Sequence, residues 1–482
     1  MSVMDSLNNI NLKEPIDSDG LLLSVHKFGG SSLADSQKLA RIVNIIKTQT
    51  QSNDYIVVSA NGNITDLLVE INQGNLIAIE KIVNFFTLLV QSVLRSPDIL
   101  LDEFLGDIEK IKTSCLSEEE ILSYGEVWSA KLLTALLLES DIAAIFIDAR
   151  EIFRSDAIEK PSYFDKNYFN EGIRQHTYGR FNERAIVTGY IAKNQSGQTV
   201  TLGRNGSDYS ATLLASFLNA QSVTLWTDVC GIFTADPRII PNAQPIKQLT
   251  FDEAEALASI GTNVLHQKTI SPLKANKIPL FVKSSLEPEK SGTVVSFLSE
   301  FDKPKSIAIR HNLSEVEIDL EGVSLSTIEQ AFHRLFESHV NLFLLQKTQK
   351  QARYIIAESQ LPLLESILQN FALKMLIVRQ KCSVISIVGQ GVTNCSKKID
   401  RLSLLISSRK TTPETETASV IASNQLIINV VLLSDKWQTI LAKIYDVFFE
   451  TTNRILHSHD ISQELVNRSK HETIELTTEA VN

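Results

Sequence analysis

The sequence predicts an α/β protein, with a mostly parallel sheet sandwiched by helices and a smaller α+β region after it. Between residues 21 and 298, short β-branched runs alternate with longer helical patterns, and glycine-rich turns follow several of the runs. After residue 305 the pattern is β-rich and lacks such turns. Strands that alternate with helices are typical of a parallel sheet covered on both faces. Ligands bind such sheets beyond the carboxyl ends of their strands.

Seven runs in the first region are predicted to be buried strands. They are Leu22–Phe28, Tyr55–Ser59, Ala143–Ile147, Ala185–Tyr190, Thr199–Leu202, Val223–Trp226 and Pro279–Val282. Between them lie helical patterns such as Leu39–Ile46, whose apolar residues fall on one face. The β-rich region predicts six more strands and two helices. These are the strands Ile307–Arg310, Val316–Leu320, Arg353–Ala357, Val384–Val388, Ser419–Ala422 and Leu426–Leu433, and the helices Phe332–Glu337 and Leu363–Leu373.

The chain has 482 residues, which is too long for one compact core, so two or three domains are expected. A charged, proline-containing stretch near Leu298–Lys305 has the composition of a linker. We therefore expect a polar N-terminal extension (1–20), a first domain (21–298), a β-rich region (306–450) and a polar C-terminal tail (451–482).

The composition favours a cytoplasmic protein that acts on small molecules. The formal charge of −10 argues against a nucleic-acid partner, which would require a basic face. The four cysteines form no CxxC pair, so neither a disulfide framework nor a zinc site is expected. No apolar run has the pattern of a signal peptide or the length of a membrane span. We expect no membrane association and no cluster of metal ligands.

The first chemical motif is Lys27–Ser32, a Lys-Phe-Gly-Gly-Ser-Ser run after the first strand. Two consecutive glycines let the backbone approach an anion closely, and Ser32 with Asp35 resembles a capping box that opens a helix. Free N–H groups at a helix start, beside the Lys27 ammonium, would bind a phosphate. A tight strand–helix turn without function is the alternative interpretation.

The second motif is Gly203–Asp208, which leads into a helix predicted over Ser210–Leu218. The Arg204 guanidinium offers a bidentate fork for a carboxylate. Asp208 at a helix start near a phosphate site must face a cation, and Lys27 is the obvious one. The alternative is that Asp208 only caps the helix and Arg204 is an ordinary surface residue.

Two further motifs are weaker on their own. In the segment Trp226–Arg238, a strand that ends in Thr227-Asp228 presents a hydroxyl and a carboxylate to a nucleotide, and Arg238 would reach its phosphates. The run Ser123–Glu126 is predicted to be a turn before a helix over Val127–Leu138, with Glu126 binding an ammonium group or remaining solvated in the first helical turn. No GxxxxGK[ST] pattern is present, which argues against a P-loop enzyme.

Taken in order, these motifs resemble the aspartate kinases of the amino-acid-kinase fold, particularly the kinase half of the bifunctional aspartate kinase–homoserine dehydrogenases. The resemblance covers Val25 to Val295 densely, and a fainter resemblance to paired regulatory ACT domains covers Ser306 to Glu450. It rests on the runs VHKFGGSSLAD, VVSANGNITDLL, YGEVWSAKLL, DARE, VTGYIA, TLGRNGSDYSATLLA, WTDVCGIFTADPR, VLHQKT and SGTVV.

The resemblance implies a role for each matching residue. It makes Lys27 the catalytic cation and Asp208 the acid that orients it. The ATP-binding positions that it implies are Lys27, Phe28, Gly29, Gly30, Thr227, Asp228, Phe233, Arg238, Asn263 and Val264. The aspartate-binding positions that it implies are Ser59, Thr65, Glu126, Arg204, Asn205, Gly206 and Ser207. Three residues depart from the family pattern: Phe233 replaces a tyrosine, Cys230 a proline and Asn263 a lysine. All three lie on the nucleotide side, so they bear on ATP affinity rather than on catalysis.

The resemblance implies an ATP- and Mg²⁺-dependent kinase that forms 4-phospho-L-aspartate, the first step towards lysine, threonine and methionine. The aspartate side chain is already ionised at neutral pH, so no general base is needed. The only candidate dinucleotide fingerprint, Gly389–Gly391, lacks a third glycine, and we expect a monofunctional enzyme. The alternatives are a kinase for glutamate, carbamate or a nucleoside monophosphate, and a non-catalytic sensor that keeps the fold.

The ACT-like region predicts an oligomer and weak feedback inhibition. We expect a homodimer or a higher homo-oligomer formed through this region. Regulated relatives carry a Gly-Met turn and a later Ser-Glu pair that hold an amino-acid effector. Here the corresponding stretches, Asp319–Ser326 and Leu345–Lys350, lack the methionine and the Ser-Glu pair, and Glu321 would repel an effector carboxylate. Inhibition by lysine or threonine is therefore expected to be weak or absent.

Overall fold

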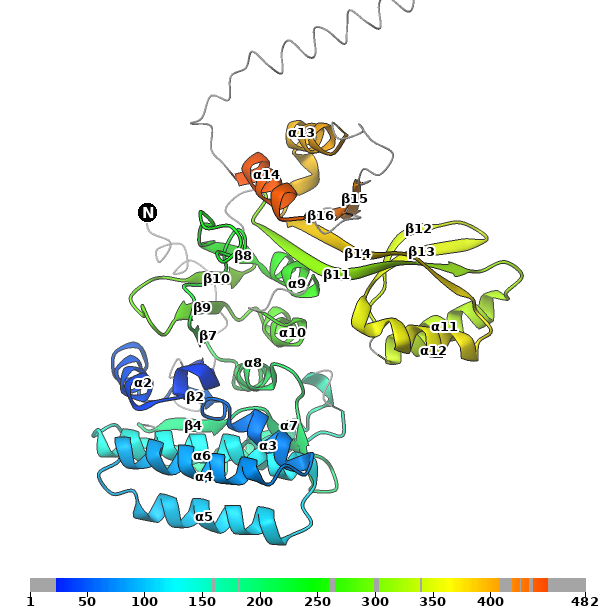
Figure 1. The fold of residues 1–482 in the computed structure, drawn as a ribbon. Coiled ribbons are helices and arrows are strands. Elements are labelled where there is room, and N and C mark those ends of the chain that lie inside the picture. The colour runs from blue at the N-terminus through cyan, green and yellow to red at the C-terminus, as the bar shows by residue number, and fades with distance from the viewer. Residues whose placement is uncertain are drawn as a thin grey trace, which may run out of the picture.

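The computed structural model describes residues 23–157, 161–180, 182–260, 265–298, 303–338, 340–407, 418–424, 426–432 and 437–449. They form two units, one built on an eight-stranded sheet and one on a six-stranded sheet (Figure 1). The predicted fold class, a mostly parallel α/β unit followed by an α+β unit, is confirmed. The expected N-terminal extension and C-terminal tail lie outside the described residues.

The first sheet has the strand order β3-β4-β2-β1-β7-β9-β10-β8. Adjacent strands are parallel from β3 through to β9, β10 runs antiparallel to β9, and β8 is parallel to β10. The strands are β1 (Ser24–Phe28), β2 (Tyr55–Val58), β3 (Ala144–Ile147), β4 (Arg184–Thr188), β7 (Ser222–Thr227), β8 (Gln248–Thr250), β9 (Leu280–Ser284) and β10 (Thr293–Ser296). All seven predicted strands are present, but Thr199–Leu202 corresponds to β6 (Thr199–Thr201), which pairs with β5 (Ile191–Lys193) outside the main sheet.

Helices cover both faces of this sheet because its strands alternate apolar side chains between two cores. Val25 of β1 packs in one core, and Phe28 of the same strand packs in the other. The helices of the Phe28 side are α2 (Ser36–Gln49), α3 (Ile64–Asn72), α4 (Ile77–Val93), α5 (Asp98–Thr113) and α6 (Glu118–Glu139). Those of the Val25 side are α7 (Lys166–Thr177), α8 (Gly206–Leu218), α9 (Phe251–Ser259) and α10 (Gln267–Asn276). Short 3-10 turns lie at η1 (Gly30–Leu33), η2 (Ala149–Glu151) and η3 (Pro161–Tyr163).

Helix α6 corrects the prediction of a turn at Ser123–Glu126. A capping box starts the helix earlier: the Ser117 hydroxyl accepts the Glu120 N–H, and the Glu120 carboxylate accepts the Ser117 N–H. Ser123–Glu126 therefore lies inside the helix. By length and composition α6 could cross a membrane, yet 78% of its apolar window is buried inside the protein. It is the central core helix of the first unit.

The second unit contains an antiparallel sheet with the order β12-β13-β11-β14-β16-β15. The strands are β11 (Ser306–Asp319), β12 (Phe343–Lys347), β13 (Gln351–Ala357), β14 (Met375–Val388), β15 (Ala418–Asn424) and β16 (Ile427–Leu432). The helices are α11 (Leu325–Glu337), α12 (Leu361–Asn370), α13 (Ser396–Ser407) and α14 (Trp437–Phe449), with 3-10 turns at η4 (Glu358–Gln360) and η5 (Val392–Asn394). Two separately predicted strands form the single β11, which bends at Asn312, where φ is 56° and the pairing register shifts.

The two units share a core and several hydrogen bonds. Ala235 and Ile240 of the first unit pack with Tyr445 of α14 in one apolar cluster. The hydroxyl groups of Thr234 and Tyr445 lie 2.8 Å apart. On α9, the fully buried Glu253 carboxylate accepts the Gln390 N–H at 2.8 Å from the turn after β14. The same carboxylate accepts the Thr250 N–H in the capping box of α9.

We predict that Glu253→Ala destabilises the junction between the units, because it leaves the buried N–H of Thr250 and the partly buried N–H of Gln390 without their acceptor. The expected loss is about 1–3 kcal/mol of unfolding free energy, chiefly from the buried Thr250 N–H. Glu255→Ala on the same helix is the control, since Glu255 forms a partly exposed ion pair with Lys274 that contributes under about 1 kcal/mol. Calorimetric thermal unfolding measures both variants, and equal midpoints for the two would contradict the prediction.

Candidate active site

The carboxyl ends of β1, β2, β4 and β7 lie at one edge of the first sheet, and most of the chemical motifs follow them. Lys27 of β1 faces the start of α8, where its Nζ lies 2.6 Å from Asp208 Oδ1. Both side chains are mostly buried, at 13% and 17% exposed. The expected pairing of these two residues is therefore observed. Asp208 occupies the first turn of α8, where the helix dipole also favours a negative charge.

The glycine pair after β1 brings two strand ends together. A Cβ atom on Gly30 would lie 2.5 Å from the Ala60 carbonyl oxygen, so this position requires glycine. The Gly62 N–H donates to the Gly30 carbonyl at 3.0 Å, which ties the turn after β1 to the turn after β2. The capping box expected from Ser32 does not form, because a 3-10 turn intervenes and Asp35 caps α2.

Glu126 of α6 is the most perturbed carboxyl group of the site. Its side chain is buried (the residue is 3% exposed), and its Oε2 atom has no hydrogen-bond partner among the described residues. Burial raises the pKa of Glu126 to about 8, against the opposing effects of the nearby Lys27 ammonium and an N–H of Ala60. The alternative of a solvated Glu126 is therefore wrong. A buried carboxyl oxygen without a partner next to a cation marks a candidate ligand contact.

Two other glycines allow helices to reach this edge of the sheet. A Cβ on Gly125 would lie 2.9 Å from the Ala60 Cβ, so glycine lets α6 approach the turn after β2. A Cβ on Gly189, after β4, would lie 2.6 Å from the Ser207 Cβ at the start of α8. Together these contacts place the turns after β1, β2 and β4 around Lys27.

Sequence reasoning did not select Gly189 and Tyr190 as site residues. Tyr190 adopts a left-handed backbone with φ of 67°, and its N–H donates to the Ser210 hydroxyl of α8 at 2.9 Å. Burial is the main cause that raises the pKa of the Tyr190 hydroxyl, and the Glu126 charge adds to it. Both residues lie at the end of the predicted strand Ala185–Tyr190. Their position there was the available signal, because Lys27 was selected for the same reason.

The other predicted aspartate-binding residues lie around this edge. Ser59 follows β2, and its N–H donates to the Phe28 carbonyl at 3.2 Å. Thr65 lies half-buried in the first turn of α3. Arg204 is exposed and has no ion pair among the described residues, and Asn205 caps α8 with a left-handed φ of 55°. Gly206 and Ser207 are buried in the first turn of α8.

The predicted nucleotide-binding residues fall into two groups. Thr227 and Asp228 lie beside the glycine turn, because Trp226 of β7 pairs with Phe28 of β1. Phe233 and Arg238 belong to the segment that packs on the second unit, where the Arg238 side chain is 81% exposed and paired with Asp236 at 2.7 Å. The predicted residues Asn263 and Val264 lie outside the described residues. The neighbouring His266 caps α10 and accepts the Lys268 N–H.

No group of three or more His, Cys, Asp and Glu side chains that could hold a metal ion occurs in the part of the chain that the structure describes. A magnesium ion at this site would therefore depend on ligands other than a protein cage. Mg²⁺ is usually bound through one or two carboxylates together with substrate phosphates.

Comparison with known proteins agrees with this geometry. The model of the "Amino acid kinase family" matches residues 23–284, more than half of the chain. Lysine-sensitive aspartokinase 3 of Escherichia coli is 35% identical over 308 residues, which cover 60% of this chain and 67% of that protein. Bifunctional aspartokinase/homoserine dehydrogenase 2 of E. coli is 34% identical over 284 residues, 56% of this chain but only 35% of that protein.

Solved structures extend the likeness over both units. The structure of E. coli aspartokinase III in complex with aspartate and ADP has a TM-score of 0.71 and 25% identity, and it covers 89% of this chain and all of that chain. The fold and the relatives define a kinase. The chain belongs to the amino acid kinase family and, within it, to the aspartokinases.

The pKa of Glu126 gives a prediction about ligand binding. An ammonium group binds the ionised carboxylate, but below a pKa of about 8 the free site holds mainly the protonated form. Affinity for aspartate should therefore rise with pH, by about tenfold per unit well below the pKa, as protonation ceases to compete. Calorimetry between pH 6 and pH 8 measures this affinity and the protons released on binding. Glu126→Gln should bind more weakly and with a flat pH profile; a pH-independent wild-type affinity would contradict the assignment.

Proposed function

We propose that this protein transfers the γ-phosphoryl group of ATP to the side-chain carboxylate of L-aspartate, forming 4-phospho-L-aspartate and ADP. The observation that carries the proposal is the buried Lys27–Asp208 ion pair beside the buried, incompletely bonded Glu126. The relatives named aspartokinase and the related structure with bound aspartate and ADP support it. We also propose that the protein is cytoplasmic.

The reaction requires no general base from the protein. The aspartate β-carboxylate is ionised at neutral pH, because its reference pKa is near 4. One of its oxygens attacks the γ-phosphorus, the bond from that phosphorus to the bridging oxygen breaks, and ADP leaves with the bond electrons. Catalysis then depends on alignment and on neutralising the negative charge of the phosphoryl group.

Lys27 supplies that positive charge at the carboxyl end of β1. Asp208 holds the ammonium at 2.6 Å and so fixes its position before the nucleotide binds. The N–H groups around Gly29 and Gly30 lie next to it in the turn that contacts Ala60. ATP would enter as its Mg²⁺ complex, in which the ion neutralises phosphate charge and is held chiefly by phosphate oxygens.

Two oppositely charged groups would select an α-amino diacid. Glu126 would bind the α-ammonium of aspartate, and Arg204 would bind a carboxylate with its fork of N–H donors. Ser207, buried at the start of α8, lies between Arg204 and Asp208 in the chain. A non-catalytic sensor is the second candidate function, favoured by the nucleotide-side departures Phe233, Cys230 and Asn263.

We predict that Lys27→Ala lowers turnover at least about 100-fold in a folded protein, because one cation that stabilises transition-state charge contributes this much or more. Formation of aspartyl hydroxamate from aspartate, MgATP and hydroxylamine measures the rate. Lys38→Ala, which removes an exposed partner of Asp35, is the matched control and should leave the rate unchanged. Wild-type protein without any hydroxamate would favour the sensor, and near-normal turnover in Lys27→Ala would exclude the catalytic role of Lys27.

We also propose that the chain forms a homodimer or a higher homo-oligomer through the second unit. Large apolar side chains are exposed there. They include Leu325, Phe336, Leu344, Leu363, Leu376 and Ile377. The first unit exposes large apolar side chains as well, so the proposal rests on the resemblance of the second unit to paired ACT domains, with these six side chains as candidate contacts.

The stretches Asp319–Ser326 and Leu345–Lys350, which correspond to the effector site of regulated relatives, support the expectation of weak feedback inhibition. The two stretches compared in the sequence lie together: the Leu320 N–H donates to the Lys350 carbonyl at 2.7 Å, and Lys350 forms an ion pair with Glu321 at 2.6 Å. This pair is exposed, so it offsets only part of the repulsion that Glu321 exerts on a carboxylate. Ser324 caps α11 with its own hydroxyl, which uses one of the N–H groups that an effector would need.

Lysine or threonine at millimolar concentration is therefore expected to leave the aspartate kinase rate almost unchanged. The hydroxamate assay at subsaturating aspartate measures this for each amino acid, with methionine as a further test. Clear inhibition by either lysine or threonine would show that the second unit still binds an effector.

A further inference from the structure

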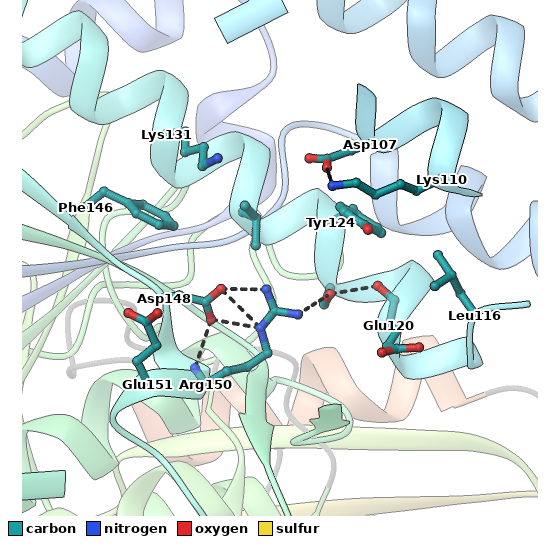
Figure 2. Close-up of a pocket in the computed structure, with 12 residues that line it drawn as sticks. Asp107, Lys110, Leu116, Glu120, Tyr124, Lys131, Phe146, Asp148, Arg150 and Glu151 are labelled. Atoms are coloured by element: carbon teal, nitrogen blue, oxygen red, sulfur yellow. Dashed lines mark hydrogen bonds and ion pairs between the residues drawn. The ribbon is translucent and has the colours of Figure 1, made fainter. Parts of the chain in front are cut away.

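Arg150 lies beside a charged cavity of about 310 Å³ between α5, α6 and the turn after β3 (Figure 2). The cavity contains three basic side chains, and each already has an acidic partner. Lys110 lies 2.9 Å from Asp107, and Arg150 lies 2.6 Å from Asp148. Lys131 lies 2.6 Å from Glu103. The cations of this cavity are thus neutralised within the protein. This points to a set of structural contacts between segments rather than to a ligand site.

The Arg150 guanidinium joins three segments that are distant in sequence. Its Nε and Nη2 atoms bind the Asp148 carboxylate on the same turn. Its Nη1 donates to the Ser123 hydroxyl at 3.2 Å and to the Thr199 hydroxyl at 3.3 Å. Figure 2 shows the guanidinium between Asp148 and the end of α6 that carries Glu120. Asp148 therefore fixes the guanidinium so that its remaining donors connect α6 with β6.

Each of the two acceptors lies close in sequence to a substrate-binding position. Ser123 precedes Glu126 by one helical turn on α6, and its hydroxyl proton donates to the Glu120 carbonyl, which leaves its oxygen free to accept. Thr199 begins β6, and the chain continues from β6 through Leu202 into the loop that carries Arg204. Arg150 thus connects α6, the helix that carries Glu126, to β6, the strand that leads to Arg204.

We propose that Arg150 is a positioning residue for the amino-acid substrate, because it sets the separation between Glu126 and Arg204. The inference rests on the proposed function, in which these two residues bind the ammonium and a carboxylate of aspartate. Both groups are attached to a small ligand, so an error of about 1 Å in the separation strongly weakens productive binding. Among the described residues, the Arg150 side chain bonds to Asp148, Ser123 and Thr199, none of which is a predicted nucleotide-binding residue.

The test compares the two substrates in Arg150→Met. We expect KM for aspartate to rise about tenfold, which corresponds to the loss of one charge-assisted hydrogen bond, while KM for ATP changes less than twofold. A general loss of folded protein would instead lower the amount of active enzyme and leave both KM values in place. The matched control is Arg154→Met, which breaks a similar ion pair with Asp165 at 2.6 Å in the same region.

Two further variants remove only the acceptors and keep the Arg150–Asp148 pair. Ser123→Ala and Thr199→Val should each give part of the rise in aspartate KM, and neither should add to it in the Arg150→Met background. These variants test the proposal even where Arg150→Met fails to fold. Equal effects on both substrates, an equal effect of Arg154→Met, or unchanged aspartate KM in both acceptor variants would overturn the positioning role.

Calorimetric binding of aspartate separates this inference from the proposed function. If the wild-type protein does not bind aspartate, both proposals fail together. If the wild type binds aspartate and Arg150→Met binds it equally well, the positioning role fails while the proposed function stands. Weaker binding by Arg150→Met, with nucleotide binding unchanged, is the expected result.

Discussion

The ion pair between Lys27 and Asp208 connects β1, in the middle of the first sheet, to α8, the helix that follows the Gly203–Asn205 loop. A lysine that is 13% exposed at the edge of a sheet is costly unless an anion lies next to it. Asp208 satisfies that requirement from the first turn of α8, where the helix dipole favours its negative charge. The close contact at Gly189 then follows, since the turn after β4 must approach the start of α8, while the contact at Gly30 brings the turn after β1 against Ala60 in the turn after β2.

The same cation explains the behaviour of Glu126. Burial without a full set of hydrogen bonds raises the pKa of this carboxyl to about 8, although the Lys27 charge acts in the opposite direction. In the free protein, Lys27 is already neutralised by Asp208, so it cannot also stabilise an ionised Glu126 fully. A substrate ammonium would supply the missing positive charge. Under the proposed function, the ammonium of the substrate would complete the charge pairs of this site.

Much of the first unit could be predicted from its sequence, because its strands are buried apolar runs and its ligand turns follow them. Lys27 and Asp208 could even be paired, since an acid at a phosphate site requires a cation. The prediction of a turn at Ser123–Glu126 was wrong because Gly125 was read as a turn signal, whereas it serves close helix packing against Ala60. The capping box at Ser117 and Glu120 was the available signal. The contacts of Arg150 with Ser123 and Thr199 could not be predicted, because these residues come from segments that are distant in sequence.

The two substrate sides of the site depend on different parts of the molecule. Glu126 and the loop after β6 both belong to the first unit, where Gly125 packs α6 against Ala60 and Arg150 bonds to both α6 and β6. Ala235 and Ile240, which flank Arg238 on the nucleotide side, are buried instead in a core that the second unit completes through Tyr445. Helix α14 therefore packs directly on the segment that carries Arg238. Under the proposed function, this packing would link the second unit to the nucleotide side without any effector bound to its loop.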